Sequence, residues 1–129
     1  MSEAPLIAIV DDDVMICEAT SDLVEAFGFN ARTFTSAGEF LNSDCVSSTA
    51  CLISDVQMPG MNGLQLHRKL ITSGRHIPVI FITAFPDERV RKRAVGAGAV
   101  CYLSKPFDSE RLRSCIRSAL GYEEQSANA

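Results

Sequence analysis

Residues 6–13 read LIAIVDDD, five apolar residues followed directly by three aspartates. Three later segments have the same form, an apolar run that ends in a residue able to contact a phosphate or a metal. They are CLIS before Asp55, VIFI before Thr83 and VCYLS before Lys105. Continuous apolar runs of this length are typical of parallel strands that helices cover on both faces. The four ends are therefore predicted to meet at one edge of a sheet.

Helix-like segments alternate with these runs. The first covers residues 14–27, a short second one opens at Ser36, and a third covers 64–73 with Leu66, Leu70 and Ile71 directed inward. The fourth begins at Pro86-Asp87, and the last is capped by Asp108 or Ser109. With a further strand at 30–35, five strand–helix repeats in 129 residues predict a doubly wound open sheet in a single domain with a core of about 5–120.

Charge is distributed unevenly along the chain. The net charge is −4, which argues against nucleic acid as the main ligand. No apolar run is long enough to span a membrane, and the N-terminus lacks a secretory pattern. Residues 1–63 hold ten acidic side chains and one basic one, whereas 87–120 hold eight basic and four acidic ones. This division predicts an acidic pocket early in the chain and a basic face late in it. The basic run that includes Arg91 and Arg93 is most simply a solvated helix face, and a docking surface is the alternative.

The cysteines and histidines point to no metal site. The five cysteines are odd in number and none are spaced C-x-x-C, so they are predicted to be buried thiols in a reducing cytosol. His67 and His76 lie near no cysteine at zinc-ligand spacing and are predicted to be surface or loop residues. The five cysteines are Cys17, Cys45, Cys51, Cys101 and Cys115.

The aspartates are the strongest candidates for a functional site. Adjacent carboxylates at Asp11, Asp12 and Asp13 repel one another, and a divalent cation would relieve that repulsion. Asp13 is also suited to cap the helix that follows. Asp55 lies in an apolar setting, where a carboxylate requires a metal or cation, and it is a possible nucleophile toward phosphorus. Alternatively, Asp55 is an aspartate that begins a turn and has no chemical role. Thr83 and Lys105, each taken alone, could equally be ordinary residues at the end of a strand.

Four motifs occur in a specific order. They are Asp11-Asp12, then Asp55 with Met58-Pro59-Gly60 and Gly63, then Thr83-Ala84, then Lys105-Pro106-Phe107. Together they resemble the receiver domain of bacterial two-component response regulators, the CheY-like family, over about residues 5–120. The resemblance implies a five-stranded parallel sheet with strand order 2-1-3-4-5. It also implies a cytoplasmic phospho-acceptor in signal transduction rather than a turnover enzyme.

The same resemblance implies a role for each site residue. Asp55 would accept a phosphoryl group from a phosphohistidine on a sensor histidine kinase or phosphotransfer protein. Asp12, Asp55 and the backbone carbonyl of Gln57 would bind Mg²⁺, with Asp11 acting through water. Lys105 and Thr83 would contact phosphoryl oxygens.

The resemblance to this family also implies a conformational switch. Movement of Thr83 would let Tyr102 turn inward. That would remodel the face formed by the fourth helix, the fifth strand and the last helix, for a downstream partner or a second copy. No direct contact with nucleic acid or a membrane is expected. Phe85, beside Thr83, is predicted to obstruct attacking water and to lengthen the life of the phosphorylated form.

Three alternatives are weighed against this reading. The chain could be a stand-alone regulator, which we favour modestly, or the N-terminal receiver of a longer DNA-binding regulator. A haloacid-dehalogenase-like phosphatase would use a D-x-D pair such as Asp11 and Asp13, but the later acidic pair of that family is missing. A flavodoxin-like carrier is disfavoured because three aspartates would repel the flavin phosphate.

Overall fold

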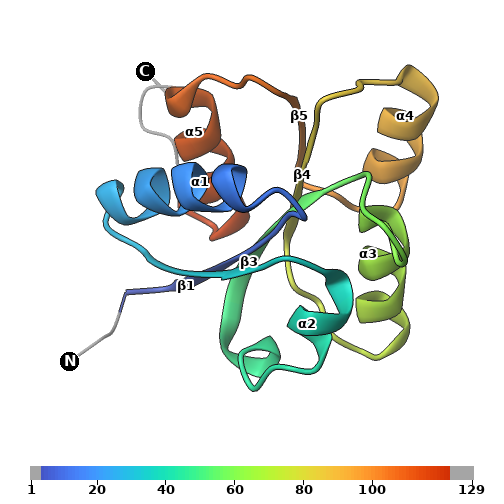
Figure 1. Ribbon diagram of the computed structural model, residues 1–129, viewed down its shortest axis with the longest axis horizontal. Helices are drawn as coiled ribbons and strands as arrows, with labels where there is room; N and C mark the ends of the chain where they lie inside the picture. Colours follow the sequence, from blue (N-terminus) through green and yellow to red (C-terminus); the bar gives the residue numbers. More distant parts are fainter. Residues whose placement is uncertain (1–3, 123–129) are drawn as a thin grey trace.

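Five parallel strands form the centre of the computed structural model, which describes residues 4–122, and their order is β2-β1-β3-β4-β5. Figure 1 shows the strands at the centre with helices around them. The predicted doubly wound topology is confirmed. The strands are β1 (Leu6–Val10), β2 (Asn30–Phe34), β3 (Thr49–Asp55), β4 (Val79–Thr83) and β5 (Cys101–Ser104). The helices are α1 (Val14–Ala26), α2 (Ala37–Leu41), α3 (Gly63–Thr72), α4 (Glu88–Gly96) and α5 (Ser109–Ala119), with a short 3₁₀ turn at Val46–Ser48.

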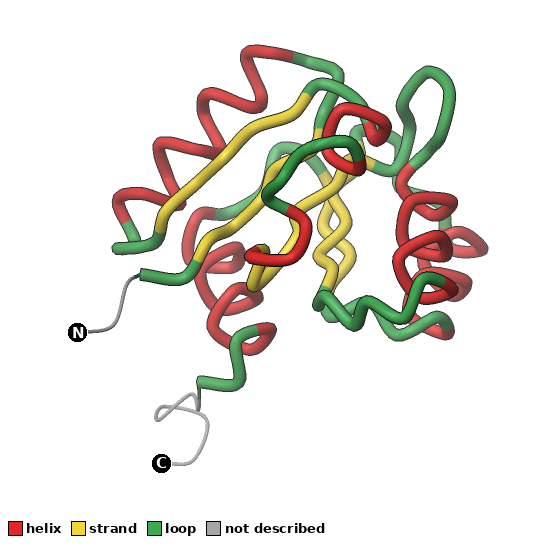
Figure 2. Tube along the Cα trace, turned by 90° about the horizontal axis from the view of Figure 1, so that it is seen from below, coloured by secondary structure: helices red, strands yellow, loops and turns green. Residues whose placement is uncertain are grey.

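Helices cover both faces of the sheet (Figure 2). On one face Ile7 and Ile9 of β1 pack with residues of α1 and α5. On the other face Ala8 and Val10 of the same strand pack with residues of α2, α3 and α4. Because neighbouring residues of a strand point to opposite faces, both faces of β1 need apolar side chains. This explains why the strand reads as a continuous apolar run.

Side-chain caps fix where the helices begin, close to the predicted positions. Asp13 accepts hydrogen bonds from the first backbone N–H groups of α1, as predicted, and Asp108 caps α5. Asn62 and Gln65 form a reciprocal capping box at α3, and Asp87 caps α4. These caps end the loops that follow the strands, so they determine where each loop turns back from the sheet.

α3 is rotated relative to its prediction. Its buried residues are Gly63, Leu66, His67 and Leu70, whereas Ile71 is exposed. The prediction that His67 lies on the surface is wrong, because its ring packs edge-on against Phe81 at 5.7 Å between centroids. Burial lowers the pKa of His67. His76 is exposed, as predicted.

The cysteines divide into two groups. Cys17, Cys45 and Cys51 are free and buried, as predicted. Cys101 and Cys115 form a disulfide, so the prediction of five free thiols is wrong for these two. The fold brings β5 and α5 together with a Cα–Cα distance of 6.2 Å, within the usual range for a disulfide. Among residues 4–122 no helix is both long and apolar enough to cross a membrane.

Candidate functional site

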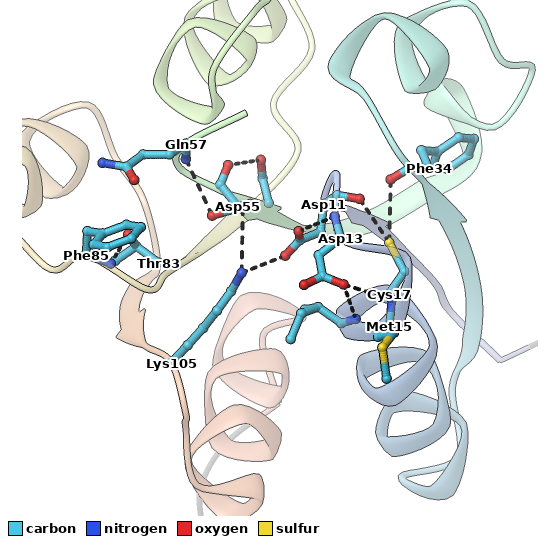
Figure 3. Close-up of polar contacts among 12 residues, drawn as sticks. Asp11, Asp13, Met15, Cys17, Phe34, Asp55, Gln57, Thr83, Phe85 and Lys105 are labelled. Carbon is cyan, nitrogen blue, oxygen red and sulfur yellow. Dashed lines mark hydrogen bonds and ion pairs between the residues drawn. The ribbon is translucent and has the colours of Figure 1, made fainter. Parts of the chain in front are cut away.

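The carboxyl ends of β1, β3 and β5 bring the predicted carboxylates and lysine together (Figure 3). Lys105 Nζ lies 2.9 Å from Asp11 Oδ2 and 3.6 Å from Asp55 Oδ2. Asp11, Asp12 and Asp55 each offer a carboxylate oxygen, and these oxygens lie within 4.8 Å of one another. Parallel strands all end at the same edge of a sheet, which is why residues far apart in the chain meet here.

Asp11 is held in place from several directions. It is fully buried, and its Oδ1 accepts a hydrogen bond from the backbone N–H of Asp13 at 2.9 Å. Its Oδ2 accepts one from Lys105, and its carbonyl accepts one from Cys17 Sγ at 3.2 Å. Cys17 comes from α1, so this contact ties the helix to the end of β1. Sequence reasoning predicted that Cys17 is buried, but it does not indicate which backbone group the thiol contacts.

Asp55 carries a carboxyl group that resists ionisation. Burial and the neighbouring charge of Asp11 raise its pKa to about 6, and Lys105 only partly opposes them. The backbone N–H of Gln57 donates a weak hydrogen bond to Asp55 at 3.4 Å. Burial disfavours the charged form of Lys105, but its hydrogen bond to Asp11 and the charges of Asp11 and Asp55 outweigh burial and raise its pKa. One ammonium therefore serves two buried carboxylates, and a divalent cation would supply the missing positive charge.

The turn after Asp55 is packed tightly against the start of α3. Ser54 Oγ donates a hydrogen bond to the carbonyl of Asp55 at 2.9 Å, and Gly63 N–H donates to the carbonyl of Val56 at 2.8 Å. A Cβ atom on Gly63 would overlap the carbonyl oxygen of Asp55. Gly63 was recognised as part of a motif, but this close approach is visible only in three dimensions. Ser54 and Gly63 thus fix the backbone that carries the Asp55 carboxylate.

Thr83 and Tyr102 connect the site to α4. Thr83 is buried at the end of β4, and its Oγ1 accepts a hydrogen bond from the backbone N–H of Phe85 at 3.0 Å. The Phe85 side chain is 69% exposed. The Tyr102 hydroxyl accepts a hydrogen bond from the backbone N–H of Asp87, the cap of α4, at 3.3 Å. The loop from Thr83 to Asp87 is therefore held at both ends by groups predicted to act in switching.

The predicted basic face is divided by α4. Arg91 lines a cleft with Tyr102 and Ser104 of β5, and it forms an ion pair with Glu88 at 2.6 Å. Arg93 lines a different cleft, together with Leu64 of α3. The two arginines therefore lie on different sides of α4, because residues two apart on a helix point in nearly opposite directions.

Fold and site together define a class of protein. An open doubly wound sheet has its ligand site beyond the carboxyl ends of its strands, and here that site holds three carboxylates and an ammonium beside a buried hydroxyl. Such a set of groups is suited to binding a divalent cation and a phosphoryl group.

Comparison with known proteins identifies the family. The model of the response regulator receiver domain matches residues 7–117, and the chain belongs to this family of two-component signalling proteins. It is 43% identical over 127 residues to the response regulator protein TodT of Pseudomonas putida, covering 98% of the chain and 56% of TodT. It is 44% identical over 115 residues to the response regulator protein TmoT of Ectopseudomonas mendocina, covering 89% and 52%.

A solved structure agrees with this assignment. The response regulator receiver protein from Burkholderia phymatum is 41% identical, and the match covers 92% of this chain and 97% of that one with a TM-score of 0.78. The chain spans about half the length of the curated relatives described above. The shared part is the receiver domain, which belongs to no classical enzyme family.

Proposed function

We propose that this chain is a phospho-acceptor receiver, with Asp55 taking a phosphoryl group from the phosphohistidine of a sensor histidine kinase or phosphotransfer protein. The observation that carries the proposal is the position of Lys105, whose ammonium contacts both Asp11 and Asp55 at the edge of the sheet. A carboxylate nucleophile, a cluster able to bind a metal and a mobile cation are the parts that phosphoryl transfer requires.

In this mechanism the chain positions groups and neutralises charge. A carboxylate oxygen of Asp55 attacks the phosphorus, and the bond to the donor imidazole nitrogen breaks as the new bond forms. Lys105 follows the developing charge on a phosphoryl oxygen, and the Thr83 hydroxyl donates a hydrogen bond to another. The backbone held by Ser54 and Gly63 keeps the Asp55 carboxylate directed toward the incoming group.

Mg²⁺ fits the oxygen ligands at this edge. Carboxylates and carbonyl groups are the ligands it prefers, and Asp11, Asp12 and Asp55 lie close enough together to share one ion. Asp12 and Asp55 would bind directly, the backbone carbonyl of Gln57 would add a third oxygen, and Asp11 would act through water. The ion would neutralise charge on the phosphoryl oxygens during transfer.

The output is a change of surface. When the Thr83 hydroxyl turns to the phosphoryl group, its hydrogen bond from Phe85 is lost and the loop that leads to Asp87 is free to move. Tyr102 then turns inward, and the face formed by α4, β5 and α5 binds a downstream partner or a second copy. Arg91 lies on this face, so Arg91→Glu is expected to weaken that binding, whereas Arg93→Glu on the α3 side serves as its control.

A phosphatase that uses Asp11 and Asp13 is less well supported. The Asp13 carboxylate already accepts hydrogen bonds from Met15 and Ile16 at the start of α1, which leaves it poorly placed for acid–base work. The proposed receiver acts in the cytoplasm as a single unit without direct contact to nucleic acid or a membrane. This proposal is the same whether the receiver is a stand-alone protein or part of a longer regulator.

Incubation with Mg²⁺ and acetyl phosphate, followed by intact mass spectrometry, tests the proposal. We expect a gain of one phosphoryl group in the parent chain and none in Asp55→Asn. Asp22→Asn, an exposed aspartate on α1, should gain it normally. No gain in a folded parent chain, or an equal gain in Asp55→Asn, would refute the assignment.

A further inference from the structure

The disulfide between Cys101 and Cys115 encloses the segment that carries both Tyr102 and Lys105. The two cysteines are 14 residues apart in the sequence and link β5 to α5. Lys105 lies four residues after Cys101 and reaches the carboxylates of the site. A covalent bond on this loop therefore acts on the residues that connect phosphorylation to the surface.

β5 is attached to a different helix on each face. Cys101 packs in the core layer with α1 and α5, whereas Tyr102 packs in the layer with α2, α3 and α4. The Tyr102 hydroxyl contacts the start of α4, and the disulfide joins the strand to α5. β5 is also the edge strand of the sheet and is only four residues long. With a backbone ladder on one side alone, these two attachments control its freedom to move.

We propose that the Cys101–Cys115 disulfide is a reversible modification that holds β5 and Lys105 in the unphosphorylated arrangement and so slows phosphoryl acceptance at Asp55. Its effect on Asp55 rests on the proposed function. To receive the phosphoryl group, Lys105 must leave Asp11 for a phosphoryl oxygen, and Tyr102 must turn. A cross-link that fixes β5 against α5 opposes both movements, and its reduction releases them.

The bond forms by exchange with a low-molecular-weight disulfide such as oxidised glutathione. Cys101 is partly exposed and Cys115 is buried, so the Cys101 thiolate attacks first, forming a mixed disulfide and releasing one glutathione thiolate. The Cys115 thiolate then attacks the Cys101 sulfur and releases the second. Two electrons pass from the protein sulfurs to the small disulfide, and the two thiol protons end on the two glutathiones.

Two of the three free cysteines are poor candidates for the first attack on the small disulfide. Burial raises the pKa of Cys51 to about 12, and burial together with the charge of Asp11 raises the pKa of Cys17 to about 11. Buried thiols of this kind are poor nucleophiles. Disulfides in a reducing compartment are mostly transient and redox-sensing, which favours a regulatory bond over a permanent one.

Thiol counting tests the modification directly. The full chain is equilibrated with reduced or oxidised glutathione, denatured, alkylated and weighed. We expect five alkyl groups after reduction and three after oxidation, because three cysteines remain free. Cys101→Ser should lose this difference, and Cys45→Ser should keep it. Cys115→Ser should instead retain one glutathione on Cys101 after oxidation, because no second thiol releases it. Five alkylated thiols in the oxidised parent chain would overturn the proposal.

The rate of phosphoryl gain from acetyl phosphate tests the consequence. The oxidised parent chain should be slower than the reduced chain by at least about fivefold, the lower end of typical coupling between two sites. Both serine variants should react at the reduced rate whatever the glutathione ratio. Equal rates for oxidised and reduced parent chains would overturn the proposal.

Hydrogen exchange separates this inference from the proposed function. If neither redox form gains a phosphoryl group, the proposed function fails, and the restraint on β5 is judged by amide exchange alone. Reduction should then speed exchange in residues 101–108 of the parent chain and leave Cys101→Ser unchanged. No difference between the redox forms in this segment would overturn the restraint.

Discussion

Replacing Asp55 with asparagine should stabilise the protein when no divalent cation is present. The pKa of Asp55 is raised from 3.8 to about 6, first by burial and then by the charge of Asp11. One pKa unit corresponds to about 1.4 kcal/mol, so the ionised form at pH 7 is disfavoured in the folded state by about 3 kcal/mol. An amide of nearly the same size removes that penalty and leaves Lys105 with its hydrogen bond to Asp11.

The sign of the pH dependence follows from the raised pKa. Between about pH 4 and pH 6 the folded parent chain keeps a proton on Asp55 that the unfolded chain has released. Folding then binds a proton, so the contribution of this group to stability falls as the pH rises through that window and stays low above it. The stability gain of Asp55→Asn over the parent chain should be largest at pH 7 and should vanish near pH 4.

Thermal unfolding in EDTA, followed by circular dichroism from pH 4 to pH 7, measures this difference. A gain of about 3 kcal/mol raises the Tm of a domain of this size by roughly 10 °C. Asp22→Asn on the exposed surface of α1 should change stability by less than about 0.5 kcal/mol. Added Mg²⁺ should stabilise the parent chain more than Asp55→Asn, because the variant lacks one ligand carboxylate.

Two results would refute this reasoning. If Asp55→Asn were no more stable than the parent chain at pH 7 in EDTA, Asp55 would not be held against its ionisation. If its advantage did not shrink on acidification, the stability gain would have another origin. Neither result tests phosphoryl acceptance by Asp55, which is measured separately by intact mass spectrometry after incubation with acetyl phosphate.

Further substitutions test other parts of the site. Lys105→Gln should slow phosphoryl gain by about 100-fold, measured by a mass time course, since one contact to the developing charge is lost; an unchanged rate would contradict its role. Phe85→Ala should shorten the life of the phosphorylated form, measured as mass loss after the donor is removed, because a bulky side chain beside Thr83 no longer hinders water; an unchanged decay would count against shielding. Gly63→Ala should lower the free energy of unfolding, measured in urea, by about 1–3 kcal/mol, because the added Cβ atom overlaps the Asp55 carbonyl oxygen. In Gly38→Ala the added Cβ atom has no atom within 4 Å, so this control should leave the free energy of unfolding unchanged or raise it.

The predictions that succeeded depend on local sequence or on topology. Asp13 and Asp108 cap helices because a short acidic side chain can reach the first free N–H groups, whatever the rest of the fold does. Asp11, Asp55 and Lys105 meet because parallel strands must all end at one edge. Neither inference requires knowledge of which way a helix faces.

The predictions that failed all concern the orientation of a helix. Leu66 and Leu70 lie on the buried face of α3, as predicted, but this face includes His67 and excludes Ile71. The prediction used side-chain apolarity alone and therefore placed Ile71 inside and His67 at the surface. The partnership of Cys101 with Cys115 depends on how α5 packs on β5, which neither residue reveals alone.

Under the proposed function, β5 is the element that links the site to the surface that changes. Its residues alternate between the two faces of the sheet, so Cys101 contacts the α5 side and Tyr102 the α4 side, and Lys105 directly after the strand reaches the carboxylates. A change in the partners of Lys105 therefore acts on a short edge strand that is attached to both helices of the proposed output face. Coupling between the site and the surface then needs no series of contacting side chains across the core, because β5 and the lysine that follows it reach the carboxylates, α4 and α5.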